Sequence, residues 1–162
     1  MKEKITHWLL NRFQKLVINI NLLIVGAIQS NKEFIFLKKL INKYSLNSRV
    51  FFLGYQKNPL PIIKECEFLL HTSFSEGFPN AVLQAISLRK SVLNTTSCGD
   101  GKYICSEYKW CKNIITNSST ILGENISMFI DSKKDIKRDL NNLNEYKIKK
   151  VLDAYEKIIN YL

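Results

Sequence analysis

The fold of this chain is decided by the stretch SFSEGFPNAVLQAISL at residues 73–88. It sets one carboxylate, Glu76, and one glycine, Gly77, just ahead of Pro79, and an apolar helical pattern follows. Proline suits the first turn of a helix, because the N–H that it lacks has no partner there. We therefore predict a loop and then a helix from Pro79 to Leu88, with an acid at the mouth of that helix.

Short apolar runs stand on both sides of this stretch, at residues 21–26, 50–54, 67–71, 91–95 and 113–116. Runs that are apolar on both faces are typical of strands in a parallel sheet covered by helices. Helical patterns separate them, at about residues 6–18, 32–45, 60–65, 119–130 and 145–161. This alternation predicts an α/β fold, a Rossmann-like parallel sheet with helices on both faces, built as a single domain over residues 1–162.

The charge of the chain is basic and uneven. The formal net charge is +10, and residues 1–65 carry 11 basic and 3 acidic side chains, a net +8. Such a segment suits an anionic partner, for example a phosphorylated ligand or a membrane surface, and a solvated basic surface explains it equally well. Aromatic residues stand among lysines at residues 102–112, but no RNA or DNA motif accompanies them. We therefore expect packing there and no nucleic acid partner.

The cysteines form no C-x-x-C pair; they are Cys66, Cys98, Cys105 and Cys111. We expect reduced thiols, no metal, no cofactor and a cytoplasmic location. The apolar run at residues 16–28 is interrupted by two asparagines and is too short to span a bilayer. We interpret it as a helix end that leads into a strand, and expect no export signal or membrane-spanning segment.

The stretch at residues 73–88 resembles the donor-binding motif of the retaining glycosyltransferases of family 4, which belong to group 1 and have the GT-B fold. The family pattern reads E-G-F-x-x-x-x-x-E-A; residues 76–80 match its start, and Gln84 stands at the place of the second acid. The segments 22–26, 50–55 and 91–99 are similar to family segments in the same order. The resemblance covers most of the chain and implies the C-terminal, donor-binding half of such an enzyme.

The resemblance also implies a role for each matched residue. Glu76, the implied catalytic residue, would bind hydroxyls of the donor sugar, and Gln84 would contact the ribose. The segment that faces the sugar and the diphosphate would be Gly77, Phe78, Pro79 and Asn80, and the base would meet Gly54 and Tyr55. Elementary physics agrees, since a helix N-terminus offers N–H groups to a phosphate and ligands gather beyond the carboxyl ends of parallel strands. The alternative is a mere strand-to-helix turn, with Phe78 in the core and Glu76 solvated.

The sequence departs from the family pattern in several places. Gln84 replaces an acid, which we expect to weaken ribose binding by roughly 1–3 kcal/mol. Residues 26–29 read GAIQ, where the family usually has a Gly-Asp-Gly-Pro turn. The family's first strand of this half, with its Arg and Lys pair, and the whole N-terminal half have no counterpart here. Lys102 after Gly-Asp-Gly is interpreted as a loop lysine beside a turn at Asp100, and His71 as a core or rim group.

The missing strand has a structural consequence. In the sheet order 3-2-1-4-5-6, the first strand lies between the second and the fourth. The strands at 21–26 and 67–71 would then face a gap. Either they close directly on each other, or another chain supplies the strand, or the protein is marginally stable.

The favoured hypothesis is a donor-binding domain that transfers a sugar from a nucleotide diphosphate sugar, in particular a UDP-sugar, with retention. Surface polysaccharide or lipopolysaccharide synthesis would be its setting, and a chain with the N-terminal half would be its partner, without which we expect little activity. The alternatives are a non-catalytic nucleotide-sugar binding module, a truncated remnant, and a basic subunit that docks at the inner face of the membrane.

Overall fold

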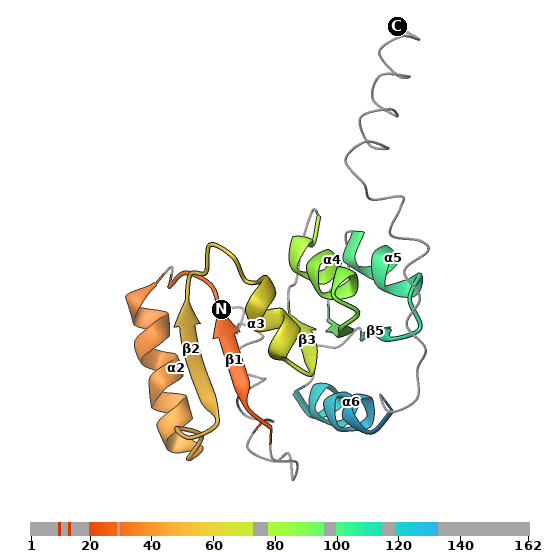
Figure 1. Cartoon of the computed structure of the whole chain (residues 1–162). Coiled ribbons are helices and arrows are strands. Elements are labelled where there is room, and N and C mark those ends of the chain that lie inside the picture. Colours follow the sequence, from red (N-terminus) through yellow and green to blue (C-terminus); the bar gives the residue numbers. More distant parts are fainter. Residues whose placement is uncertain are drawn as a thin grey trace, which may run out of the picture.

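The structure is a computed structural model, and it describes Leu10, Phe13 and residues 20–28, 30–72, 78–95, 100–114 and 119–132. Strands and helices alternate in this part of the chain (Figure 1), as β1 (Leu22–Val25), α2 (Asn31–Lys43), β2 (Val50–Gly54), α3 (Leu60–Glu65), β3 (Phe68–His71), α4 (Asn80–Ser87), β4 (Ser91–Asn94), α5 (Asp100–Ser106), β5 (Cys111–Asn113) and α6 (Ser119–Ser132). The predicted α/β fold is confirmed. Of the predicted helix at 6–18 only Leu10 and Phe13 are described, both helical and buried, and the predicted helix at 145–161 lies outside the described residues.

The strands form two parallel groups. β1 pairs with β2, and β3, β4 and β5 pair in that order. No strand in the described part of the chain joins β1 to β3. The alternative in which these two strands close directly on each other is therefore wrong, since β1 and β3 stand in separate groups.

Helices cover both faces of the larger group of strands. α4 and α5 pack on one face, where Val92 of β4 lies in a core cluster with Ile86 and Ile104. On the other face Leu93 of β4 lies in a second cluster with Ile126 of α6. In Figure 1, α4 and α5 lie on one side of β3 and β5, and α6 lies on the opposite side. Every residue of β4 is buried, so β4 is the central strand of this layered structure.

The prediction that all strands are covered on both faces is wrong for β1 and β2. Leu23 is 37% exposed, Val25 is 42% exposed and Phe51 is 40% exposed. Leu23 and Phe51 are neighbours across the β1–β2 pair, so they belong to one face. The helices α4 and α5 cover this face of the sheet over β3, β4 and β5, with which they make their main contacts. The same face of β1 and β2 therefore stays partly exposed.

Three local predictions are also corrected. The last strand was predicted at 113–116 but spans Cys111–Asn113, because its register is set by pairing with β4. Asp100 and Gly101, predicted to form a turn, instead begin α5, since Ile104 and Cys105 of that helix are buried in the core. The helix predicted from Pro79 begins one residue later, at Asn80, and Pro79 occupies the N-cap of α4. Among the helices of the described residues, none has the length and apolar character needed to cross a membrane.

Candidate functional site

Polar side chains end three neighbouring strands and bond to one another. His71 Nδ1 lies 2.8 Å from Asn94 Oδ1, and Asn94 Nδ2 donates to Asn113 Oδ1 at 2.8 Å. Asn113 Nδ2 then donates to the Lys102 carbonyl oxygen at 2.9 Å. Because the Asn94 oxygen can only accept, His71 carries its proton on Nδ1. We call His71, Asn94 and Asn113 the strand-end network.

The strand-end network fixes the carboxyl edge of the sheet, where parallel folds bind their ligands. Asn94 is fully buried, and the Thr95 N–H donates to the His71 carbonyl oxygen at 3.0 Å. The loops that leave β3 and β4 therefore begin from fixed positions. The sequence analysis considered His71 alone and missed Asn94, which bonds to it, and Asn113, which bonds to Asn94. The predicted last strand began at Asn113 and did not end there, so the sequence did not show that three successive strands end in polar side chains.

The helix α4 begins beside this edge. Pro79 is buried, and its Cγ lies 3.4 Å from the point where a Cβ on Gly101 would stand, so it packs at the start of α5. Phe78 is 47% exposed, which contradicts the alternative that places its ring in the core. Asn80 is exposed, and its N–H donates to the Phe78 carbonyl oxygen at 3.0 Å.

The N-terminus of α4 is electrostatically suited to an anion. Its first turn contains no acidic side chain, and within the part of the chain that the structure describes no side chain caps it. The partial positive charge of a helix N-terminus then acts on whatever lies beyond it, and a phosphate group fits such a position. Gln84 stands one turn farther along and is half-buried. Glu76 and Gly77 lie outside the described residues, so the acid of the predicted motif is not placed.

The other two candidates lie across the gap in the sheet. Gly54 ends β2 with φ +66°, and its carbonyl oxygen accepts from the Gly26 N–H at 2.9 Å. A register shift between β1 and β2 precedes this pairing. Tyr55 follows and is 75% exposed, so its ring is available at the carboxyl end of β2.

Gly54→Ala is expected to lower the free energy of unfolding by about 1 kcal/mol, because a Cβ disfavours the left-handed conformation. No atom lies within 4 Å of the added Cβ, so the effect comes from the backbone alone. Urea unfolding measures it. Gly54→Asn is the matched control and should cost less, since asparagine tolerates this conformation better. Equal losses for both variants would contradict this explanation.

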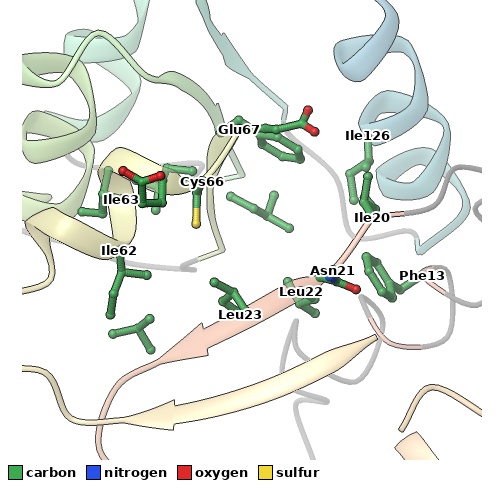
Figure 2. Close-up of a pocket in the computed structure, with 15 residues that line it drawn as sticks. Phe13, Ile20, Asn21, Leu22, Leu23, Ile62, Ile63, Cys66, Glu67 and Ile126 are labelled. Atoms are coloured by element: carbon green, nitrogen blue, oxygen red, sulfur yellow. The ribbon is translucent and has the colours of Figure 1, made fainter. Parts of the chain in front are cut away.

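A separate cavity of about 430 Å³ lies between β1 and β3. Residues of both strands line it. Figure 2 shows Leu22 and Leu23 of β1, with Phe13 and Ile126 on one side and Ile62 and Ile63 on the other. None of the described candidate residues of the predicted donor site lines this cavity. It is therefore a different feature from the carboxyl edge.

The sequence has relatives among known proteins. Residues 2–150 match the model of the family "Glycosyl transferases group 1". An uncharacterized glycosyltransferase of Methanocaldococcus jannaschii is 34% identical over 112 residues, which cover 66% of this chain and 27% of that protein. A Campylobacter jejuni enzyme, N-acetylgalactosamine-N,N'-diacetylbacillosaminyl-diphospho-undecaprenol 4-alpha-N-acetylgalactosaminyltransferase, is 28% identical over 87 residues, 54% of this chain and 23% of the enzyme.

Solved structures share the fold. The apo form of WaaB, a lipopolysaccharide outer core galactosyltransferase, matches with a TM-score of 0.76 at 17% identity, over 99% of this chain and 46% of WaaB. Anabaena HepE in complex with UDP matches with a TM-score of 0.67 at 20% identity, over 79% of this chain and 36% of HepE. The chain thus spans 23–27% of the length of the two curated relatives and less than half of each solved protein. Since the family model matches nearly all of its residues, the chain belongs to the group 1 glycosyltransferases.

Proposed function

We propose that this chain is the donor-binding part of a retaining glycosyltransferase of family 4, and that it binds a UDP-sugar at the carboxyl edge of its sheet. The observation that carries the proposal is the start of α4, where Pro79 is buried at the N-cap and the first turn of the helix has no acidic side chain, beside the strand-end network. A diphosphate fits this position for electrostatic reasons. Glu76 is assigned to the sugar hydroxyls and Gln84 to the ribose.

Solved structures support a uridine nucleotide as the donor. HepE has been solved with UDP, with UDP and glucose, and with UDP-glucose. The match to the complex with UDP-glucose has a TM-score of 0.64 over 77% of this chain. We therefore choose UDP and UDP-glucose as test ligands.

A role in surface polysaccharide or lipopolysaccharide synthesis, at the cytoplasmic face of the membrane, belongs to the same proposal. WaaB is a lipopolysaccharide galactosyltransferase, and the name of the Campylobacter relative places its acceptor on diphospho-undecaprenol. The acceptor side of the reaction is assigned to the part of these enzymes that this chain does not span. Residues 1–162 alone are therefore expected to bind the donor but to transfer little sugar, because catalysis needs cationic groups at the leaving diphosphate and a closed cleft.

Glu76→Ala is expected to weaken UDP-glucose binding 10- to 100-fold, because hydrogen bonds to a charged group contribute about 1.5–3 kcal/mol. UDP lacks the sugar, so its affinity should change much less. Isothermal titration calorimetry of both ligands measures the difference. Glu124→Ala, the same charge change on the exposed surface of α6, is the control and should leave both affinities unchanged.

Two results would count against the proposal. Equal UDP-glucose affinity in the parent chain and in Glu76→Ala would remove Glu76 from the sugar site. Robust turnover of a UDP-sugar by residues 1–162 alone would refute the assignment of catalysis to a larger assembly.

A further inference from the structure

The outer face of α2 combines basic and apolar side chains. Ile35 is 54% exposed and Phe36 is 48% exposed, both near the middle of the helix. Lys32 stands one turn before them and Lys39 one turn after them, and both lysines are exposed. Residues three, four and seven positions apart share one face of a helix, so these side chains form one surface. We call Lys32, Ile35, Phe36, Lys39 and Lys43 the basic stripe.

The outer face of α6 has a similar arrangement with the opposite charge. Met128 is 61% exposed and Ile121 is 45% exposed. Glu124 stands one turn before Met128 and Asp131 one turn after it, and both acids are exposed. α6 contains no lysine or arginine. We call Ile121, Glu124, Met128 and Asp131 the acidic stripe.

Both stripes belong to helices that cover the same face of the sheet. The two helices pack on one core cluster, which includes Leu40 of α2 and Ile126 of α6. Each stripe lies on the side of its helix opposite these buried residues, so both stripes face away from the same side of the sheet. Figure 1 shows the two helices apart from each other, α2 beside β2 and α6 near β3, so neither helix covers the other.

The charges of the two stripes have the same spacing. Lys32 and Lys39 are seven residues apart in α2, and Glu124 and Asp131 are seven residues apart in α6. An α-helix rises 1.5 Å per residue, so each pair spans about 10.5 Å along its helix. With the apolar centres of the two stripes placed against each other, each acid meets one lysine. This match holds for parallel and for antiparallel helices, because each apolar centre lies midway between its two charges.

A second copy of the chain suits these stripes better than a membrane does. Anionic lipids would attract the basic stripe but repel the acidic stripe on the same face of the sheet. A copy related by a two-fold axis places each basic stripe on the acidic stripe of its partner, and the same contact forms twice. Both charges are then matched, and the apolar side chains of both stripes are removed from water.

We propose that two copies of this chain form a weak two-fold dimer, in which α2 of one protomer packs on α6 of its partner. Two helix–helix contacts make a small protein–protein interface, so we expect a Kd of roughly 10–100 µM. Neither stripe contains a residue of the candidate donor site. The proposal therefore goes beyond the proposed function, and it is tested without a donor.

Charge reversal tests the pairing of the stripes. Lys32→Glu with Lys39→Glu leaves the chain with two acidic stripes, and Glu124→Lys with Asp131→Lys leaves it with two basic stripes. Sedimentation equilibrium of residues 1–162 from about 5 to about 300 µM brackets the expected Kd. Each double variant alone should dimerise at least about 10-fold more weakly than the parent chain, because like charges then meet. An equimolar mixture of the two double variants should form heterodimers with about the parent's affinity, since opposite charges meet at both contacts.

Lys57→Glu with Lys109→Glu is the matched control. Both lysines are exposed and lie outside α2 and α6, and the net charge changes as it does in Lys32→Glu with Lys39→Glu. This control variant should dimerise like the parent chain. The melting temperature of each dilute, monomeric variant separates loss of the dimer from loss of the fold.

A cross-link locates the contact. The variants Ile35→Cys and Met128→Cys are made in separate chains and mixed, so that a link between positions 35 and 128 joins two molecules. A short bismaleimide should form this link at dimer-forming concentrations and much less in dilute solution. Mass spectrometry of the proteolytic fragments separates it from links through the native cysteines.

Three outcomes would overturn the proposal. The first is unchanged dimerisation in both charge-reversed variants, or a mixture of them that forms no heterodimer. The second is a parent chain that stays monomeric up to about 300 µM but sediments with phosphatidylglycerol vesicles, which would assign the basic stripe to a membrane. The third is a monomeric parent chain whose melting temperature falls in Glu124→Lys with Asp131→Lys, which would pair the acidic stripe with lysines of the same chain.

Discussion

Replacing Leu93 with alanine is expected to lower the free energy of unfolding by about 3–4 kcal/mol, the cost of removing a large aliphatic side chain from a closely packed core. Leu93 is fully buried in β4 and lies in the cluster that includes Leu46, Ile114 and Ile126. That cluster contains residues from both strand groups, since Val50 of β2 also belongs to it. The substitution should therefore weaken the packing that holds the two strand groups together. Urea unfolding monitored by circular dichroism measures the loss.

Ile121→Ala provides the control for this prediction. Ile121 lies on α6 and is 45% exposed, so the same kind of truncation should change the stability by less than about 1 kcal/mol. Similar losses for Leu93→Ala and Ile121→Ala would show that β4 is not central to the core.

The second large effect is expected for Asn94→Ala, with a loss of about 2–4 kcal/mol. Asn94 is fully buried and bonds to His71 at 2.8 Å and to Asn113 at 2.8 Å. The substitution removes one partner from each of these groups, and a buried polar group that loses its partner costs about 1–3 kcal/mol. Differential scanning calorimetry should show a melting temperature lower by roughly 5–15 °C for a chain of this size.

Asn125→Ala is the matched control for Asn94→Ala. The Asn125 side chain donates to the Ile121 carbonyl oxygen at 2.8 Å on the outer part of α6, and alanine is the better helix former. Its stability should change by less than about 0.5 kcal/mol. If Asn94→Ala is as mild as Asn125→Ala, the strand-end network does not hold the loops at the carboxyl edge.

The strands were largely predictable because their side chains are mostly apolar and favour an extended, buried segment. Each apolar run is short, rich in Val, Leu, Ile and Phe, and bounded by polar residues, and four of the five strands lie within one residue of the predicted bounds. The fifth strand was predicted too far along the chain, because the prediction was centred on the apolar pair Ile114 and Ile115. Pairing with β4 places Cys111 opposite Val92 and ends the strand at Asn113. Register depends on the partner strand, which local sequence does not encode.

The helix α5 was missed for a different reason. Glycine and aspartate together favour a turn, and this local preference was outweighed by the burial of Ile104 and Cys105. Gly101 lies close to Asn94 and Pro79, so its small size serves packing. The sequence indicated the start of the candidate site at α4 but not the network beside it, since hydrogen bonds among three strand ends require the tertiary arrangement. The place of Glu76 is untested, because that residue lies outside the described part of the chain.

The divided sheet also bears on how long a copy of this protein would persist in a cell. Its smaller strand group leaves Leu23 and Phe51 exposed, and exposed apolar side chains promote aggregation and recognition by chaperones. A copy in which these side chains are covered should therefore persist longer than a copy in which they are exposed.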